Sequence, residues 1–126
     1  MERLIQSARR YHMEPALITQ PALYGDVIDP TTGVNLATVP FREGNGATEW
    51  ATLELYNEVT RQVARDQNVL LIDLAHEMPK DSQYFRDMIH YTNSGSKIVA
   101  NILYPPLCLF LADRFPEYVE LSCRPQ

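Results

Sequence analysis

Residues 69–73 read Val-Leu-Leu-Ile-Asp, a short run that is apolar until its last position. Successive side chains of a strand point to opposite faces, so a run that is apolar throughout predicts a strand buried on both faces. Leu17-Ile18, in a short segment between Pro15 and Pro21, has the same character. Strands covered on both faces are typical of parallel sheets, in which helices cross over each face. The two runs therefore predict an α/β fold.

Helical patterns lie before and between these strands. The clearest covers residues 48–67, with Thr48 as the expected N-cap. Its apolar stripe consists of Trp50, Leu53, Tyr56, Val59 and Val63. Residues 1–12 form a second, amphipathic pattern, whose expected buried face consists of Leu4, Ile5, Ala8 and either Tyr11 or His12. Strands separated by helices indicate a parallel, right-handed crossover.

A last helix is expected from Thr92 or Asn93 to Tyr104. Pro105-Pro106 should end or kink it, and a further helix could continue to residue 112. The resulting count is two parallel strands and three main helices, which is too small for an independent sheet covered on both faces. The sequence therefore predicts a single partial α/β domain over residues 1–126, with a long loop at 21–47 and a tail at 116–126.

Composition excludes several function classes. The chain has 126 residues, a net charge of −5 and 45% hydrophobic residues, which suits one packed domain and argues against nucleic-acid binding. The most apolar stretch, residues 98–112, is interrupted by Asn101 and Pro105-Pro106, so no bilayer-spanning segment is expected. No export signal is seen, so the sequence leaves the compartment unknown, with cytoplasmic as the default expectation. Cys108 is expected as a small buried hydrophobe and Cys123 as a free thiol.

Asp87 and His90 are the pair of residues that carries potential chemistry. A carboxylate three residues before an imidazole can accept the Nδ1–H, which leaves Nε2 as a general base for a Ser hydroxyl attacking an ester. The pair follows a strand, at the edge of the sheet where α/β proteins bind ligands. Spacing alone is a weak signal, and the alternative is that both residues are surface turn residues that cap the next helix.

The residues around this pair resemble the last conserved block of the SGNH (GDSL-like) hydrolases. The resemblance rests on residues 69–74 and 84–100, which contain Asp-x-x-His, then Thr-x-x-Gly and a helix. Residues 16–25 are similar to the penultimate strand of the family and the loop after it, and residues 56–59 to the helix between the two strands. This likeness, over residues 1 to about 115, implies a flavodoxin-like three-layer fold and cleavage of carboxylic esters of lipids, acylated sugars or small acyl groups without a metal or cofactor. His90 then matches the catalytic base and Asp87 its orienting carboxylate.

The chain departs from the family in lacking the Ser nucleophile and the Gly and Asn of the oxyanion hole, which lie upstream of the region it resembles. Gly25-Asp26-Val27 has Val where the family has Ser and follows the wrong strand, and Gly44-Asn45-Gly46 matches no family position. Ser94 and Ser96 are expected to start a helix. Because losing one oxyanion donor costs about 10²–10³ in rate, the chain alone is predicted to be inactive.

Other interpretations remain open at this stage. The chain could be a non-catalytic binding or assembly module that pairs its sheet edge with a partner. In the hydrolase interpretation, the expected partners are the acyl-ester, acylated-sugar or lipid substrate and either a second copy or a complementing N-terminal half. His76 and Glu77 near Asp73 could suggest a metal site, but their spacing matches no common ligand pattern. The 21–47 loop could border a substrate pocket through Tyr24, Asp26, Asp29 and Asn35.

Overall fold

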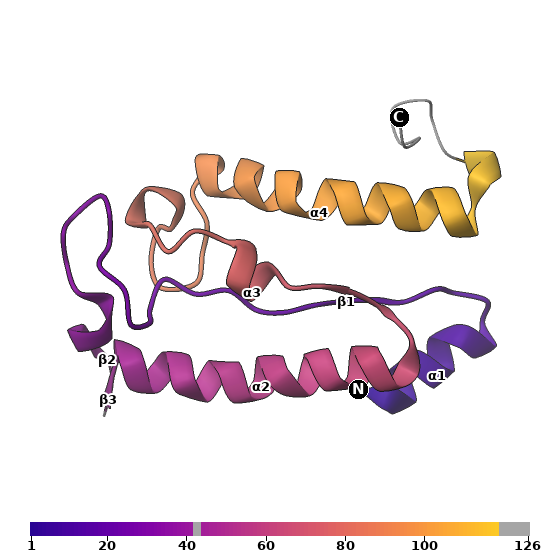
Figure 1. Cartoon of the computed structure of the whole chain (residues 1–126), viewed down its shortest axis with the longest axis horizontal. Coiled ribbons are helices and arrows are strands. Elements are labelled where there is room, and N and C mark those ends of the chain that lie inside the picture. Colours follow the sequence, from indigo (N-terminus) through magenta and orange to yellow (C-terminus); the bar gives the residue numbers. More distant parts are fainter. Residues whose placement is uncertain (42–43, 119–126) are drawn as a thin grey trace.

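The structure is a computed structural model that describes residues 1–41 and 44–118. It is a mixed α/β arrangement in three layers, with two central strands between helices (Figure 1). Helices α1 (Glu2–Arg10) and α2 (Gly46–Gln67) lie on one side of the strands, and α4 (Asn93–Arg114) lies on the other. The α/β class expected from the sequence is therefore confirmed.

The central sheet consists of β1 (Ala16–Ile18) and β4 (Leu70–Ile72), which run parallel. In their register, Ala16 lies opposite Leu70 and Ile18 opposite Ile72. Ile72 is buried, whereas 45% of Ile18 is exposed. One apolar face of β1 is thus incompletely covered within the described residues.

The start of α2 and its buried face differ from the expectation. Asn45 is the N-cap, because its side-chain oxygen accepts the backbone N–H of Thr48. The expected stripe is also wrong at Tyr56 and Val59, which are 71% and 57% exposed. The helix instead turns a mixed face toward the interior, made of Gly46, Asn57, Arg61, Val63 and Ala64. Polar side chains on this face bond to the ends of the strands, which a hydrophobic pattern cannot reveal.

Two other helices also correct the expectation. In α1 only Ile5 is buried, while Leu4 and Tyr11 are about three-quarters exposed. Helix α4 does not end at Tyr104 but runs unbroken through Pro105-Pro106 to Arg114. Ile98 and its neighbours on the first three turns pack on the core, and the helix continues beyond them despite the local penalty of the two prolines.

The continuity of α4 bears on whether the chain contains a membrane span. Because it is uninterrupted, α4 is long and apolar enough to cross a bilayer by length and composition alone. Tyr104 and Leu109 are more than half exposed on it. A single such helix is weak evidence, so the expectation of no bilayer-spanning segment stays a prediction.

The 21–47 segment is more ordered than a loop. It contains a 3₁₀ turn (Leu36–Thr38) and a small antiparallel hairpin of β2 (Pro40–Phe41) and β3 (Gly44–Asn45). Two further short elements, α3 (Leu74–Glu77) and a 3₁₀ turn at Ser82–Tyr84, follow β4. The hydrophobic core joins these regions through Leu23, Leu36, Leu74, Met78 and Phe85.

The end of the chain leaves part of the expectation outside the described residues. Pro116–Tyr118 forms a 3₁₀ turn, and the rest of the expected tail, including Cys123, lies beyond it. Cys108 is buried, as expected.

Candidate active site

Asp87 and His90 lie together on an exposed turn between β4 and α4. The Nδ1 of His90 is 2.7 Å from Oδ2 of Asp87. The other carboxylate oxygen, Oδ1, accepts the backbone N–H groups of Ile89 and His90, each at 2.9 Å. The imidazole is 71% exposed, and within residues 1–41 and 44–118 its Nε2 has no hydrogen-bonding partner. The geometry therefore fixes one ring nitrogen and leaves the other available.

The carboxylate of Asp87 is held in its charged form. Hydrogen bonds from the backbone of Ile89, from the backbone of His90 and from the His90 ring lower the pKa of Asp87 to about 2. A permanent negative charge at this position favours the tautomer of His90 that carries its proton on Nδ1. Such a tautomer presents the lone pair of Nε2 outward, as a general base requires.

Backbone contacts fix the turn on both sides. The N–H of Arg86 donates to the carbonyl of His90 at 2.7 Å, which closes the turn. The N–H of Leu23 donates to the carbonyl of Met88 at 2.8 Å and ties the turn to the segment after β1. Thr92, one of the two expected caps, is the N-cap of α4, because its hydroxyl accepts the N–H of Gly95. The carboxyl ends of both strands thus lead into one loop cluster (Figure 1).

A second Asp-x-x-His occurs at Asp73 and His76, directly after β4. The ring of His76 contacts Asp73 at 3.0 Å through Nδ1 and Glu54 at 2.9 Å through Nε2. Both ring nitrogens are therefore engaged, whereas His90 keeps one free. Spacing in the sequence cannot separate the two motifs. The contact of His76 with Glu54, which lies on α2, decides which of the two histidines keeps a free ring nitrogen.

Arg61 of α2 organises this second motif. Its guanidinium donates to both carboxylate oxygens of Asp73 at 2.9 Å and to Glu54 at 3.1 Å, and 8% of its side chain is exposed. Burial raises the pKa of Asp73, but hydrogen bonds from Arg61 and Thr19 outweigh this and lower it. The same balance lowers the pKa of Glu54. A buried cation bonded to both carboxylates disfavours a metal ion at this position, and the sequence reasoning missed this network.

The other residues singled out from the sequence have structural contacts. Asp29 is 1% exposed and accepts the N–H groups of Thr31 and Ser82, which ties the 21–47 segment to the turn after α3. Asn35 caps the Leu36–Thr38 turn. Tyr24 is buried, while Asp26 is exposed.

The serines near His90 begin a helix, as expected. Ser94 and Ser96 lie in the first turn of α4, and the Ser94 hydroxyl is 3.0 Å from that of Thr92. Asn45, which resembles an oxyanion residue in sequence, is the N-cap of α2. None of these three side chains contacts the imidazole of His90 among the described residues.

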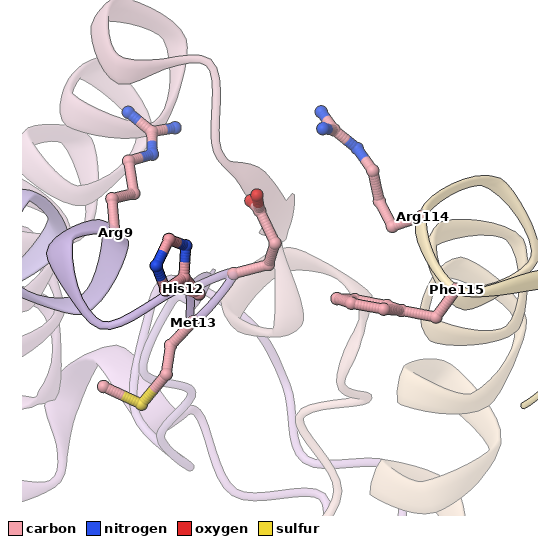
Figure 2. A pocket seen from close by; sticks show the side chains of 6 residues that line it. Arg9, His12, Met13, Arg114 and Phe115 are labelled. Carbon is pink, nitrogen blue, oxygen red and sulfur yellow. The ribbon is translucent and has the colours of Figure 1, made fainter.

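A cavity lies at the end of the fold opposite to the Asp87–His90 turn (Figure 2). It has a volume of about 260 Å³ and is formed where α1 and α4 end, by Arg9, His12, Met13, Glu14, Arg114 and Phe115. Figure 2 shows the guanidinium groups of Arg9 and Arg114 on its two sides. The cavity shares no residue with the Asp87–His90 turn.

Comparison with known proteins adds no assignment: no family model, curated protein or solved structure matches this chain.

Proposed function

We propose that this chain supplies the acid–base part of an SGNH-type carboxylic ester hydrolase, with His90 as general base and Asp87 as its orienting carboxylate. The observation that carries the proposal is the 2.7 Å contact between Nδ1 of His90 and the Asp87 carboxylate, on an exposed turn where Nε2 is unengaged. The resemblance in sequence supports the same two roles.

The chemistry follows from the tautomer of His90. With its proton on Nδ1, the ring takes the proton of a Ser hydroxyl at Nε2 while that oxygen attacks the ester carbonyl. The imidazolium so formed is stabilised by Asp87 and returns the proton to the leaving alcohol. Water then cleaves the acyl-serine by the same route. The Ser and the oxyanion donors must come from a complementing segment, because no residue of this chain matches them.

The place for that segment is the free edge of β1. The N–H of Thr19 donates to Ile72 of β4, so by the alternation of a strand the backbone groups of Ile18 and Ala16 point the other way. At Gln20 this edge is closed, since the side-chain amide of Asn57 accepts its N–H at 2.8 Å and donates to its carbonyl at 3.0 Å. The open part of the edge is therefore Ala16–Ile18.

Crossover handedness supports the same edge. Helix α2 connects β1 to β4 and lies on the same side of the sheet as α1 (Figure 1). Because parallel crossovers are right-handed in nearly all proteins, a strand leading into α1 would lie on the side of β1 away from β4. A complementing half would therefore extend the sheet from β1 and place its strand ends beside the Asp87–His90 turn.

The test is hydrolysis of a p-nitrophenyl acyl ester. The chain alone is expected to show no turnover above background. When it is produced joined to the in-frame coding sequence that precedes Met1, activity should appear and be lost in His90→Ala. The matched control is His76→Ala, which removes the other Asp-x-x-His and should retain most activity. Loss in both variants alike, or His90-dependent turnover by the chain alone, contradicts the proposal.

A non-catalytic assembly module is the second candidate, favoured by the free edge of β1 and by exposed Ile18. Such a module should be a stable monomer with one cooperative melting transition, and no coding sequence upstream should restore activity. Aggregation of the isolated chain, or obligate pairing, favours the hydrolase fragment instead.

A further inference from the structure

Lys80 is a partly buried cation that the proposed reaction does not use. Its ammonium group donates to the carbonyl of Ala22 at 2.9 Å and to that of Tyr24 at 2.6 Å. The same nitrogen lies 3.2 Å from the ring centroid of Trp50 on α2. Two charge-assisted hydrogen bonds thus join Lys80 to residues 22–24, and a cation–π contact joins the same ammonium to α2.

That segment is the one that holds the catalytic turn. Leu23 lies between the two carbonyls bound by Lys80, and its N–H donates to Met88 at 2.8 Å. Met88 in turn lies between Asp87 and His90. Gly25, with φ of +144°, packs against the aliphatic part of the Lys80 side chain. A Cβ on Gly25 would lie 3.2 Å from Cε of Lys80. Lys80 is therefore connected to the Asp87–His90 turn through a single backbone hydrogen bond.

The surroundings of Lys80 make its charge sensitive to pH. Burial lowers the pKa of Lys80 to about 8, and the nearby Glu54 carboxylate on α2 only partly opposes this. The titratable residue on the facing segment is Tyr24, whose ring packs on Phe41. On its own segment the next residue is Asp81, whose carboxylate is engaged by Thr31 and Gln83.

We propose that Lys80 is a positioning residue for the Asp87–His90 pair: its ammonium holds residues 22–24 against Trp50, and these residues hold Met88 and the turn. The inference rests on the proposed function for the meaning of that turn. Loss of the proton from Lys80 removes the positive charge from both hydrogen bonds and from the cation–π contact. The segment and the turn then loosen together.

The test uses two reporters and two lysine variants in the full chain. Trp50 is the only tryptophan, so its fluorescence reports the cation above it, and ¹³C-methyl resonances of Met88 and Leu23 report the turn. Both are followed from pH 6 to 10. Lys97, the only other lysine, provides the control Lys97→Met. Lys80→Arg keeps the charge, and Lys80→Met removes it.

In the wild type and in Lys97→Met, fluorescence and methyl resonances should change together with a midpoint near pH 8. This transition should be absent from both Lys80 variants. At pH 6, the backbone amide of Leu23 should exchange at least about tenfold faster in Lys80→Met than in Lys80→Arg, because Lys80→Met loses both charge-assisted hydrogen bonds and the loss of one alone corresponds to about tenfold. If Lys80→Met does not fold, the proposal is tested by the transition near pH 8, which should be present in the wild type and absent from Lys80→Arg.

Three results would overturn the proposal: no transition in the wild type, a transition that persists in Lys80→Arg, or a change at Trp50 that does not reach Met88. None of these measurements requires turnover. A failure of the Lys80 role is therefore distinct from a failure of the esterase proposal, which is judged by His90→Ala in the complemented protein.

Discussion

Replacing Arg61 by Met should destabilise the chain strongly, because the carboxylates of Asp73 and Glu54 then lose the cation that neutralises them. Arg61 donates to both oxygens of Asp73 and to Glu54, and only 8% of its side chain is exposed. Removing one partner of a buried ion pair costs about 3–5 kcal/mol. The two carboxylates are 27% and 24% exposed and keep some hydration, so the lower end of about 3 kcal/mol applies.

In a chain of this size, about 3 kcal/mol corresponds to a fall in the melting temperature of about 10–15 °C. Circular dichroism melts at pH 7 measure it. The matched control is Arg65→Met, one turn later on α2, where Arg65 is 55% exposed and pairs with Glu58. An exposed pair contributes about 1 kcal/mol or less, so this melting temperature should change by only a few degrees.

The contribution of Asp73 and Glu54 to stability depends on pH, and the sign of that dependence follows from their pKa values. In the folded chain the pKa values of Asp73 and Glu54 are lowered. This pair of groups therefore stabilises the fold fully above the carboxyl pKa of the unfolded chain, and the contribution is lost as the pH falls below it. Arg61→Met should lose less stability than the wild type on acidification. Equal losses for Arg61→Met and Arg65→Met at pH 7 would refute the reasoning.

Further predictions concern close packing and a buried carboxylate. Gly95→Ala should destabilise by about 2 kcal/mol in a urea titration, because its Cβ would lie 2.0 Å from the Tyr84 carbonyl oxygen; Gly44→Ala, whose nearest contact is 3.5 Å, should cost much less. Hydrogen bonds outweigh burial and lower the pKa of Asp29 from 3.8 to about 2, so its contribution is full above pH 3.8 and is lost as the pH falls through about 2. Asp29→Asn should therefore lower the free energy of unfolding by about 1–3 kcal/mol at neutral pH and weaken its dependence on pH in acid, whereas the exposed Asp26→Asn should do neither. An unchanged pH dependence in acid for Asp29→Asn would contradict this role of Asp29.

Two errors in the sequence-based predictions concern α2 and share an origin. Tyr56 and Val59 fit a hydrophobic stripe, yet they lie outside because α2 turns Asn57 and Arg61 toward the strand ends. Thr48 looked like the cap of α2, but Asn45 reaches the same helix end from three residues earlier. Both errors arise because polar side chains, rather than the apolar stripe, decide the first turn and the buried face of α2.

By itself, the sequence determined the α/β class, the two strands, the segments that become helices and the close approach of Asp87 to His90. These features depend on the alternation of side chains and on contacts across a few residues, so the local chain encodes them. The tertiary structure alone decided which Asp-x-x-His keeps a free ring nitrogen, since Glu54 and Arg61 reach His76 from another element. It likewise placed Lys80 beneath residues 22–24, because contacts between distant segments form only when the strands pair and α2 packs beside them.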